Sequence, residues 1–133
     1  GVTFGDDLTP GVDVIVPDPA FLIEKVDTLL GLVITHAHED HLGGIPYLWR
    51  QLKCPVFGTP FAAGLLKRKL SETGLDGAVP ITEIVPGGEF SIGPFDVSFI
   101  NLAHSVPETQ ALAIKTAVGT VLHVTDWKLD PIK

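Results

Sequence analysis

A nearly continuous apolar run, LLGLVIT at residues 29–35, leads directly into the polar cluster HAHEDH at residues 36–41. Apolar runs of this length are typical of strands that are buried on both faces. The cluster contains three histidines and two acids within six positions, and two glycines follow it. The chain must therefore place a group of protonatable side chains at the end of a buried strand.

Helical patterns follow this cluster. Apolar residues recur with helical spacing from Ile45, so a helix is predicted there. Residues 54–58, CPVFG, indicate a short strand. Thr59 and Pro60 are the residue types preferred at the N-cap and first position of a helix, which we expect to continue to about Glu72.

From residue 81 onward the pattern changes to short strands and turns. Strands are expected there in the segments ITEIV, PGGEFSI, FDVSFINL, ALAIKT and TVLHV. One further strand is expected near the start of the chain, in VDVIV at residues 12–16. The fold class is therefore α/β, with a mixed sheet and helices on one of its faces. We expect the other face to be left for a part that this chain lacks.

Composition restricts the class of protein. The chain has 133 residues, of which 45% are apolar and 19% are charged, as in a globular domain. It has no apolar run long enough to span a membrane. A single cysteine allows no internal disulfide, so we expect a cytoplasmic location. The net charge of −7 argues against a nucleic-acid partner, unless some carboxylates hold metal ions that reverse the local field.

The cluster has the spacing of a metal site. The zincin motif HExxH does not fit, because His38 and His41 are only three residues apart. The pattern is HxHxDH. In extended chain, His36 and His38 lie on one side and can bind one ion. A turn at Asp40 and His41 can direct both to a neighbouring ion, whereas Glu39 is expected to point away.

Two ions need further ligands. His104 in NLAHSVPE and Asp126 in HVTDWK each follow a predicted strand. Taken alone, each is typical of a turn, and a histidine cluster can also be a solvated loop. Considered with HxHxDH, they are candidate ligands. Imidazole and carboxylate donors favour Zn²⁺ or Mn²⁺ over Ca²⁺.

The order HxHxDH, then a single His, then a single Asp resembles the metallo-β-lactamase superfamily. The segments THAHEDHLGGIPYLWRQLKCPVFGTPFAAGLLKRKL, LAHSVPET and HVTDWKLDP resemble more narrowly the ribonuclease J family of the β-CASP nuclease group. The resemblance implies part of an αββα sandwich. It also implies that one ion is bound by His36, His38 and His104, a second ion by Asp40 and His41, and both by Asp126. Catalysis would fall to Asp40, His41 and Asp126.

Two departures from that family matter. Its members usually have glycine just before the last aspartate, where this chain has Thr125, whose side chain could crowd the turn that aims Asp126. A further histidine ligand and an inserted β-CASP domain are expected downstream. Residues 1–133 contain neither and have no methionine. We therefore expect an incomplete metallo-β-lactamase-like domain, without the β-CASP domain and the C-terminal half.

The resemblance implies a metal-dependent ribonuclease. Hydroxide bound by two metal ions would hydrolyse RNA phosphodiester bonds, with 5′–3′ exonuclease and endonuclease activity in rRNA processing and RNA decay. The full-length protein is expected to be a cytoplasmic homo-oligomer that binds RNA, and these 133 residues are expected to be inactive alone. The alternatives are a small-molecule metallohydrolase of the lactamase or glyoxalase II type and a non-catalytic fragment.

Overall fold

The computed structural model describes residues 2–5, 11 and 14–129 of the chain. The strands are β1 (Thr3–Phe4), β2 (Val14–Ile15), β3 (Leu32–Val33), β4 (Val56–Gly58), β5 (Ile81–Glu83), β6 (Glu89–Ile92), β7 (Phe95–Asn101), β8 (Gln110–Thr116) and β9 (Gly119–His123). The helices are α1 (Ala20–Ile23), the 3₁₀ turn η1 (Val26–Thr28), α2 (Glu39–Leu42), α3 (Ile45–Leu52) and α4 (Pro60–Glu72).

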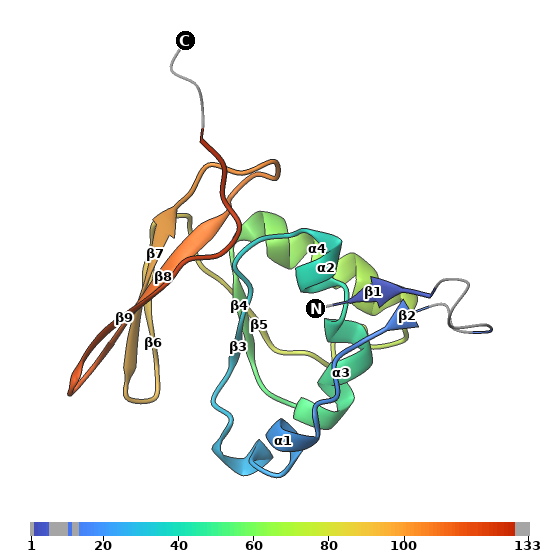
Figure 1. The fold of residues 1–133 in the computed structure, drawn as a ribbon. Coiled ribbons are helices and arrows are strands. Elements are labelled where there is room, and N and C mark those ends of the chain that lie inside the picture. The colour runs from blue at the N-terminus through green and yellow to red at the C-terminus, as the bar shows by residue number, and fades with distance from the viewer. Residues whose placement is uncertain (1, 6–10, 12–13, 130–133) are drawn as a thin grey trace.

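The strands form parallel and antiparallel sheets. β3, β4 and β5 make a parallel sheet, and β6 to β9 make an antiparallel sheet in chain order. β1 and β2 pair separately. In Figure 1, the antiparallel sheet lies on one side of β3–β5, and α2, α3 and α4 lie on the other. None of the helices within the described residues has the length and apolarity needed to cross a bilayer.

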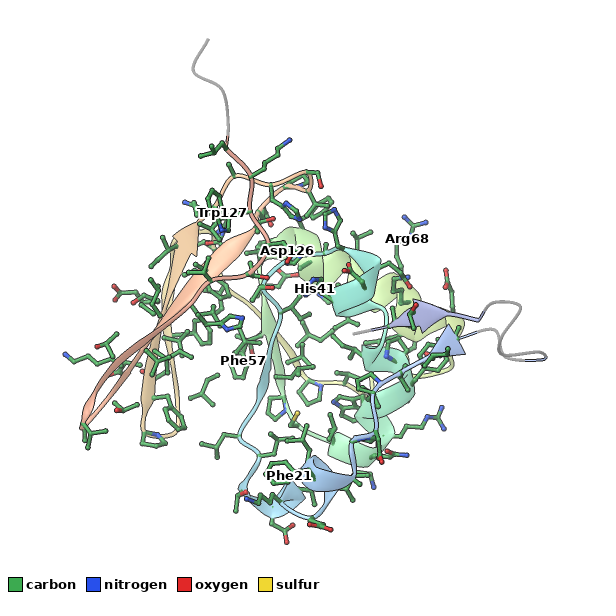
Figure 2. All side chains as sticks on the ribbon, viewed as in Figure 1. Phe21, His41, Phe57, Arg68, Asp126 and Trp127 are labelled. Atoms are coloured by element: carbon green, nitrogen blue, oxygen red, sulfur yellow. The ribbon has the colours of Figure 1, made fainter. Side chains whose placement is uncertain are left out.

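Side-chain alternation along β3 and β4 separates two apolar cores. Ile34 and Val56 pack with Leu66 of α4 in the core on the helical side. Val33 packs on the opposite side, against the core of the antiparallel sheet. Phe57 stacks there on Phe90, with ring centroids 5.3 Å apart, and Figure 2 shows Phe57 between the two sheets. The parallel sheet is thus covered on both faces, as expected for a strand of the LLGLVIT type.

The structure confirms most of the predicted elements. α4 covers the expected range from Pro60 to Glu72, and the Thr59 hydroxyl accepts a hydrogen bond from the Ala62 N–H at its start. α3 begins at Ile45, and the strands expected after residue 80 are all present. β3 is shorter than the apolar run that predicted it. Of the segment VDVIV, Val14–Ile15 forms β2, whereas residues 12 and 13 lie outside the described residues.

The sequence predicted one mixed sheet with helices on one face and the other face open, whereas the structure places the parallel and antiparallel strands in separate sheets. The antiparallel sheet covers the face of the parallel sheet that is opposite the helices, because the inward side of β7 and β8 is apolar and packs on it. Exposure is concentrated instead on β9, the edge strand, where every residue is exposed. Val121 and Leu122 of this strand are each 60% exposed.

The two sheets meet at one edge. The Gln110 N–H at the start of β8 donates to the carbonyl oxygen of Thr35, just beyond β3, over 2.9 Å. The Lys128 N–H, beyond β9, donates to the Ala103 carbonyl oxygen, beyond β7, over 2.8 Å. These contacts bring the segments after β3, β7 and β9 together, and those segments contain the predicted ligands.

Truncation of the helical core should destabilise the protein. Leu66 is fully buried, so Leu66→Ala leaves a cavity and is expected to lower the free energy of unfolding by about 2–5 kcal/mol. Leu122→Ala on exposed β9 is the matched control and should change it by less than about 0.5 kcal/mol. Urea denaturation measures both values. Equal effects would contradict this description of the core.

Candidate metal centre

The structure brings all six predicted ligands together. His36 and His38 follow β3, and Asp40 and His41 belong to α2. His104 lies in the loop after β7, and Asp126 follows β9. In Figure 2, His41 and Asp126 lie side by side near the end of β3.

Four of the side chains form a first group. His36, His38, His104 and Asp126 each offer one donor atom, and these atoms all lie within 4.8 Å of one another. His104 Nε2 is 2.9 Å from His38 Nδ1, and His36 Nε2 is 3.7 Å from Asp126 Oδ2. Three nitrogen donors and one carboxylate oxygen at this spacing match the donor types of zinc-like cations.

Asp126 also belongs to a second group, with Asp40 and His41. His41 Nε2 is 3.1 Å from Asp126 Oδ2 and 3.5 Å from Asp40 Oδ2. The predicted turn at Asp40 and His41 is the one-turn helix α2, which begins directly after His38. Glu39 lies outside both groups, as expected, and its carboxylate forms an ion pair with Lys69 of α4.

Gly43 allows the chain to leave α2. A Cβ atom at this position would lie 2.6 Å from the Glu39 carbonyl oxygen. That is closer than such atoms approach in proteins, so any larger residue would shift the turn that carries Asp40 and His41. This steric conflict explains why position 43, just after the histidine cluster, is occupied by glycine.

His36 is the most constrained of the six residues. Its ring is fully buried, and Nε2 has no hydrogen-bond partner. The pKa of His36 is lowered from 6.5 to about 4: burial is the largest cause, the charge of nearby His41 adds to it, and the Asp126 carboxylate opposes both effects. At neutral pH His36 is therefore an uncharged imidazole. Buried polar atoms are rarely left unpaired, so the unpaired Nε2 fits a metal ligand.

Three hydroxyl groups contact the imidazoles from outside the donor groups. Ser105 Oγ is 3.0 Å from His38 Nε2, and Thr35 Oγ1 is 3.0 Å from His36 Nδ1. Thr125 Oγ1 lies 3.4 Å from the same His36 nitrogen. No role was predicted for Thr35, although its position directly before the first proposed ligand was a signal.

Thr125 does not crowd the turn as expected. Its side chain is half-buried, and its hydroxyl accepts a hydrogen bond from Thr35 over 3.1 Å. Asp126, the next residue, still reaches both donor groups. The side chain fits because it extends towards the end of β3, where a polar partner is available.

Glu108 holds the loop that carries His104. Its carboxylate accepts a hydrogen bond from the Phe61 N–H, in the first turn of α4, over 2.8 Å. A negative charge at a helix N-terminus is stabilising. Glu108 has a φ of 61°, which is uncommon for a residue with a side chain. The contact at α4 compensates for this conformation and fixes the loop.

A cavity of about 480 Å³ lies beside the two donor groups. Thr35, His41, Thr125 and Asp126 line it together with apolar residues of β3 and the end of β9. A molecule in this cavity would contact Asp126, the carboxylate shared by both groups.

The buried histidine should make stability depend on pH in metal-free protein. The unfolded chain takes up a proton at His36 near pH 6.5, and the folded chain does so only near pH 4. The free energy of unfolding should therefore fall as the pH is lowered between these values. His36→Gln should flatten this part of the profile, measured by urea denaturation with a chelator. His123→Gln, on exposed β9, should retain it, and an unchanged slope in His36→Gln would refute the assignment.

Comparisons with known proteins identify the family of this chain. Residues 8–131 match the family model of the beta-lactamase superfamily domain. The ribonuclease J of Sinorhizobium meliloti is 45% identical over 130 residues, which cover 98% of this chain and 23% of that protein. The ribonuclease J of Helicobacter pylori is 40% identical over 131 residues, covering 98% and 19%. The chain thus spans less than a quarter of the length of these curated relatives.

A solved structure shows the same fold. The metallo hydrolase Igni18 from Ignicoccus hospitalis superposes with a TM-score of 0.57 at 20% identity, covering 75% of this chain and 43% of that one. The expected metallo-β-lactamase-type fold is confirmed, and the fold together with the His/Asp cluster indicates a divalent-metal site. The chain belongs to the beta-lactamase superfamily and is homologous along nearly its whole length to ribonuclease J proteins.

Proposed function

We propose that this chain is part of a metal-dependent ribonuclease that hydrolyses RNA phosphodiester bonds. The observation that carries the proposal is the pair of donor groups that share Asp126. The relatives called ribonuclease J, which match 98% of the chain, indicate RNA as the substrate class. Similarity to metallo-β-lactamase structures at about 20% identity supports only the fold.

In this proposal, two divalent cations occupy the two donor groups. His36, His38 and His104 hold one cation, Asp40 and His41 hold the other, and Asp126 binds both. The close approach of the donor atoms and the unpaired Nε2 of His36 support this assignment. The donors suit Zn²⁺ or Mn²⁺. The chemistry such a pair supplies is Lewis acidity towards water and the phosphate oxygens.

The protein's own residues would orient the reactants. The side chain of Asp40 is 65% exposed and lies at the open side of the second group, where its carboxylate can accept a proton from water. Asp40 and Asp126 together offset only two of the four positive charges of two dications. The centre would therefore retain a positive charge that attracts a phosphodiester, although the chain as a whole is acidic.

The remaining expectations stay proposals. They include 5′–3′ exonuclease and endonuclease activity, a cytoplasmic location and a homo-oligomer of the full-length protein. We also propose that residues 1–133 are an incomplete domain and that activity requires the rest of the protein. The proposal of an incomplete domain is supported by the small part of the relatives' length that the chain spans.

Loss of the shared carboxylate tests the metal assignment. Asp126→Asn keeps the shape of the side chain but removes its charge, so both cations should bind weakly and RNA cleavage should fall at least about 100-fold. Metal content by mass spectrometry and cleavage of labelled RNA by the full-length protein give the two readouts. Asp96→Asn, at an exposed acid of β7, is the control and should behave as wild type. Normal cleavage by Asp126→Asn would contradict the assignment.

A comparison of substrates tests the reaction class. The full-length protein should cleave 5′-monophosphorylated RNA, lose this activity with a chelator and regain it with Zn²⁺ or Mn²⁺. A β-lactam and a glutathione thioester should be left intact at the same enzyme concentration. Hydrolysis of either small molecule without RNA cleavage would replace the ribonuclease with the small-molecule metallohydrolase.

A further inference from the structure

Two threonines join the ends of the strands that carry His36 and Asp126. Thr35 lies beyond β3 and Thr125 lies beyond β9, ninety residues apart in the sequence. Their hydroxyl oxygens are 3.1 Å apart, and Thr35 Oγ1 is also 3.0 Å from His36 Nδ1. Both threonines are half-buried and each directly precedes a proposed ligand, so their contact lies immediately behind the donor groups.

The direction of these hydrogen bonds determines where His36 carries its proton. A hydroxyl group has one proton to donate. If Thr35 directs its proton at Thr125, 3.1 Å away, its oxygen is left to accept from His36, and Nδ1 then bears the ring proton. In the opposite arrangement Nε2 would bear it as a buried N–H without a hydrogen bond, because Asp126 Oδ2, 3.7 Å away, is too far to accept one, and that state is unfavourable. With the proton on Nδ1, the Nε2 lone pair faces the donor groups.

We propose that Thr35 and Thr125 are positioning residues that hold His36 in the Nδ1–H tautomer and fix its Nε2 relative to Asp126. The inference rests on the metal centre of the proposed function and does not depend on the RNA substrate. Neither threonine contacts a reacting atom. Thr125 contributes in two ways. Its hydroxyl forms a hydrogen bond with that of Thr35, and its backbone is joined directly to Asp126.

His38 shows the complementary arrangement. Its Nε2 is 3.0 Å from Ser105 Oγ, and its Nδ1 faces His104 in the first donor group. The hydroxyl therefore contacts Nε2 in His38 but Nδ1 in His36. In both rings the nitrogen that faces the other donors is the one without a hydroxyl contact. Hydrogen bonds from outer residues fix the tautomer of ligating histidines.

The tautomer can be measured directly. Long-range ¹H–¹⁵N correlation spectra of the metal-free full-length protein, with the signals assigned through His36→Gln, report which ring nitrogen bears the proton. We expect His36 to be protonated at Nδ1, unlike a free histidine side chain, which prefers Nε2. Thr35→Val should move the proton to Nε2 or mix the two forms. Protonation at Nε2 in the wild type would overturn the inference without any variant.

Cation affinity gives the second readout. In competition titrations with Zn²⁺ and a chromogenic chelator, Thr35→Val and Thr125→Val should each weaken binding by about 10-fold to 100-fold. Thr35→Ser and Thr125→Ser retain the hydroxyl and should stay close to wild type. Thr120→Val, at an exposed threonine of β9, is the matched control. Circular dichroism verifies that each variant is folded.

The outcomes separate this inference from the proposed function. Wild-type affinity in both valine variants would overturn the inference, and so would equal losses in the valine and serine variants. Rescue by serine together with the tautomer change would support it. The same pattern in a full-length protein that binds Zn²⁺ but cleaves no RNA would support it as well, while refuting the ribonuclease proposal.

Discussion

The unpaired Nε2 of His36 is the constraint on which the site depends. The ring is completely buried, and burial holds its pKa near 4. The atom lies 3.7 Å from a carboxylate oxygen of Asp126 but makes no hydrogen bond. Buried polar groups are rarely left without a partner, and a cation between the imidazole and the carboxylate would satisfy both groups. The packing of the protein thus creates a site that favours a positive charge, and a divalent cation would supply that charge.

The fold explains why His36 can be buried in this way. β3 lies between the helical core and the antiparallel sheet, so the chain leaves a region packed on both sides at Thr35. The backbone of Thr35 is held by Gln110 of β8, and its side chain is held by Thr125 beyond β9. His36 is therefore fully buried at the end of the segment that contains β3, and it is the first residue of the site. The other ligands are more exposed because they lie on turns around it.

Local patterns in the sequence predicted more of the site than of the sheet arrangement. HxHxDH and the alternation of helices and strands are short-range features, and the structure brings those residues together as expected. The position of His104 and Asp126 came from strand ends and from family resemblance. The contact between Thr35 and Thr125 could not be predicted, because it depends on how two sheets are placed over ninety residues. The same tertiary packing divides the strands into two sheets, where the sequence predicted one.

Each part of the site is attached to the core by a polar contact of its own. Thr35 and Thr125 join the segments that carry His36 and Asp126, Glu108 fixes the His104 loop to α4, and the pair Glu39–Lys69 fixes α2 to the same helix. None of these contacts lies within either apolar core. Loss of one contact would thus shift one set of donors while the cores stay packed. The polar contacts that place the donors and the residues that form the two apolar cores are therefore different sets.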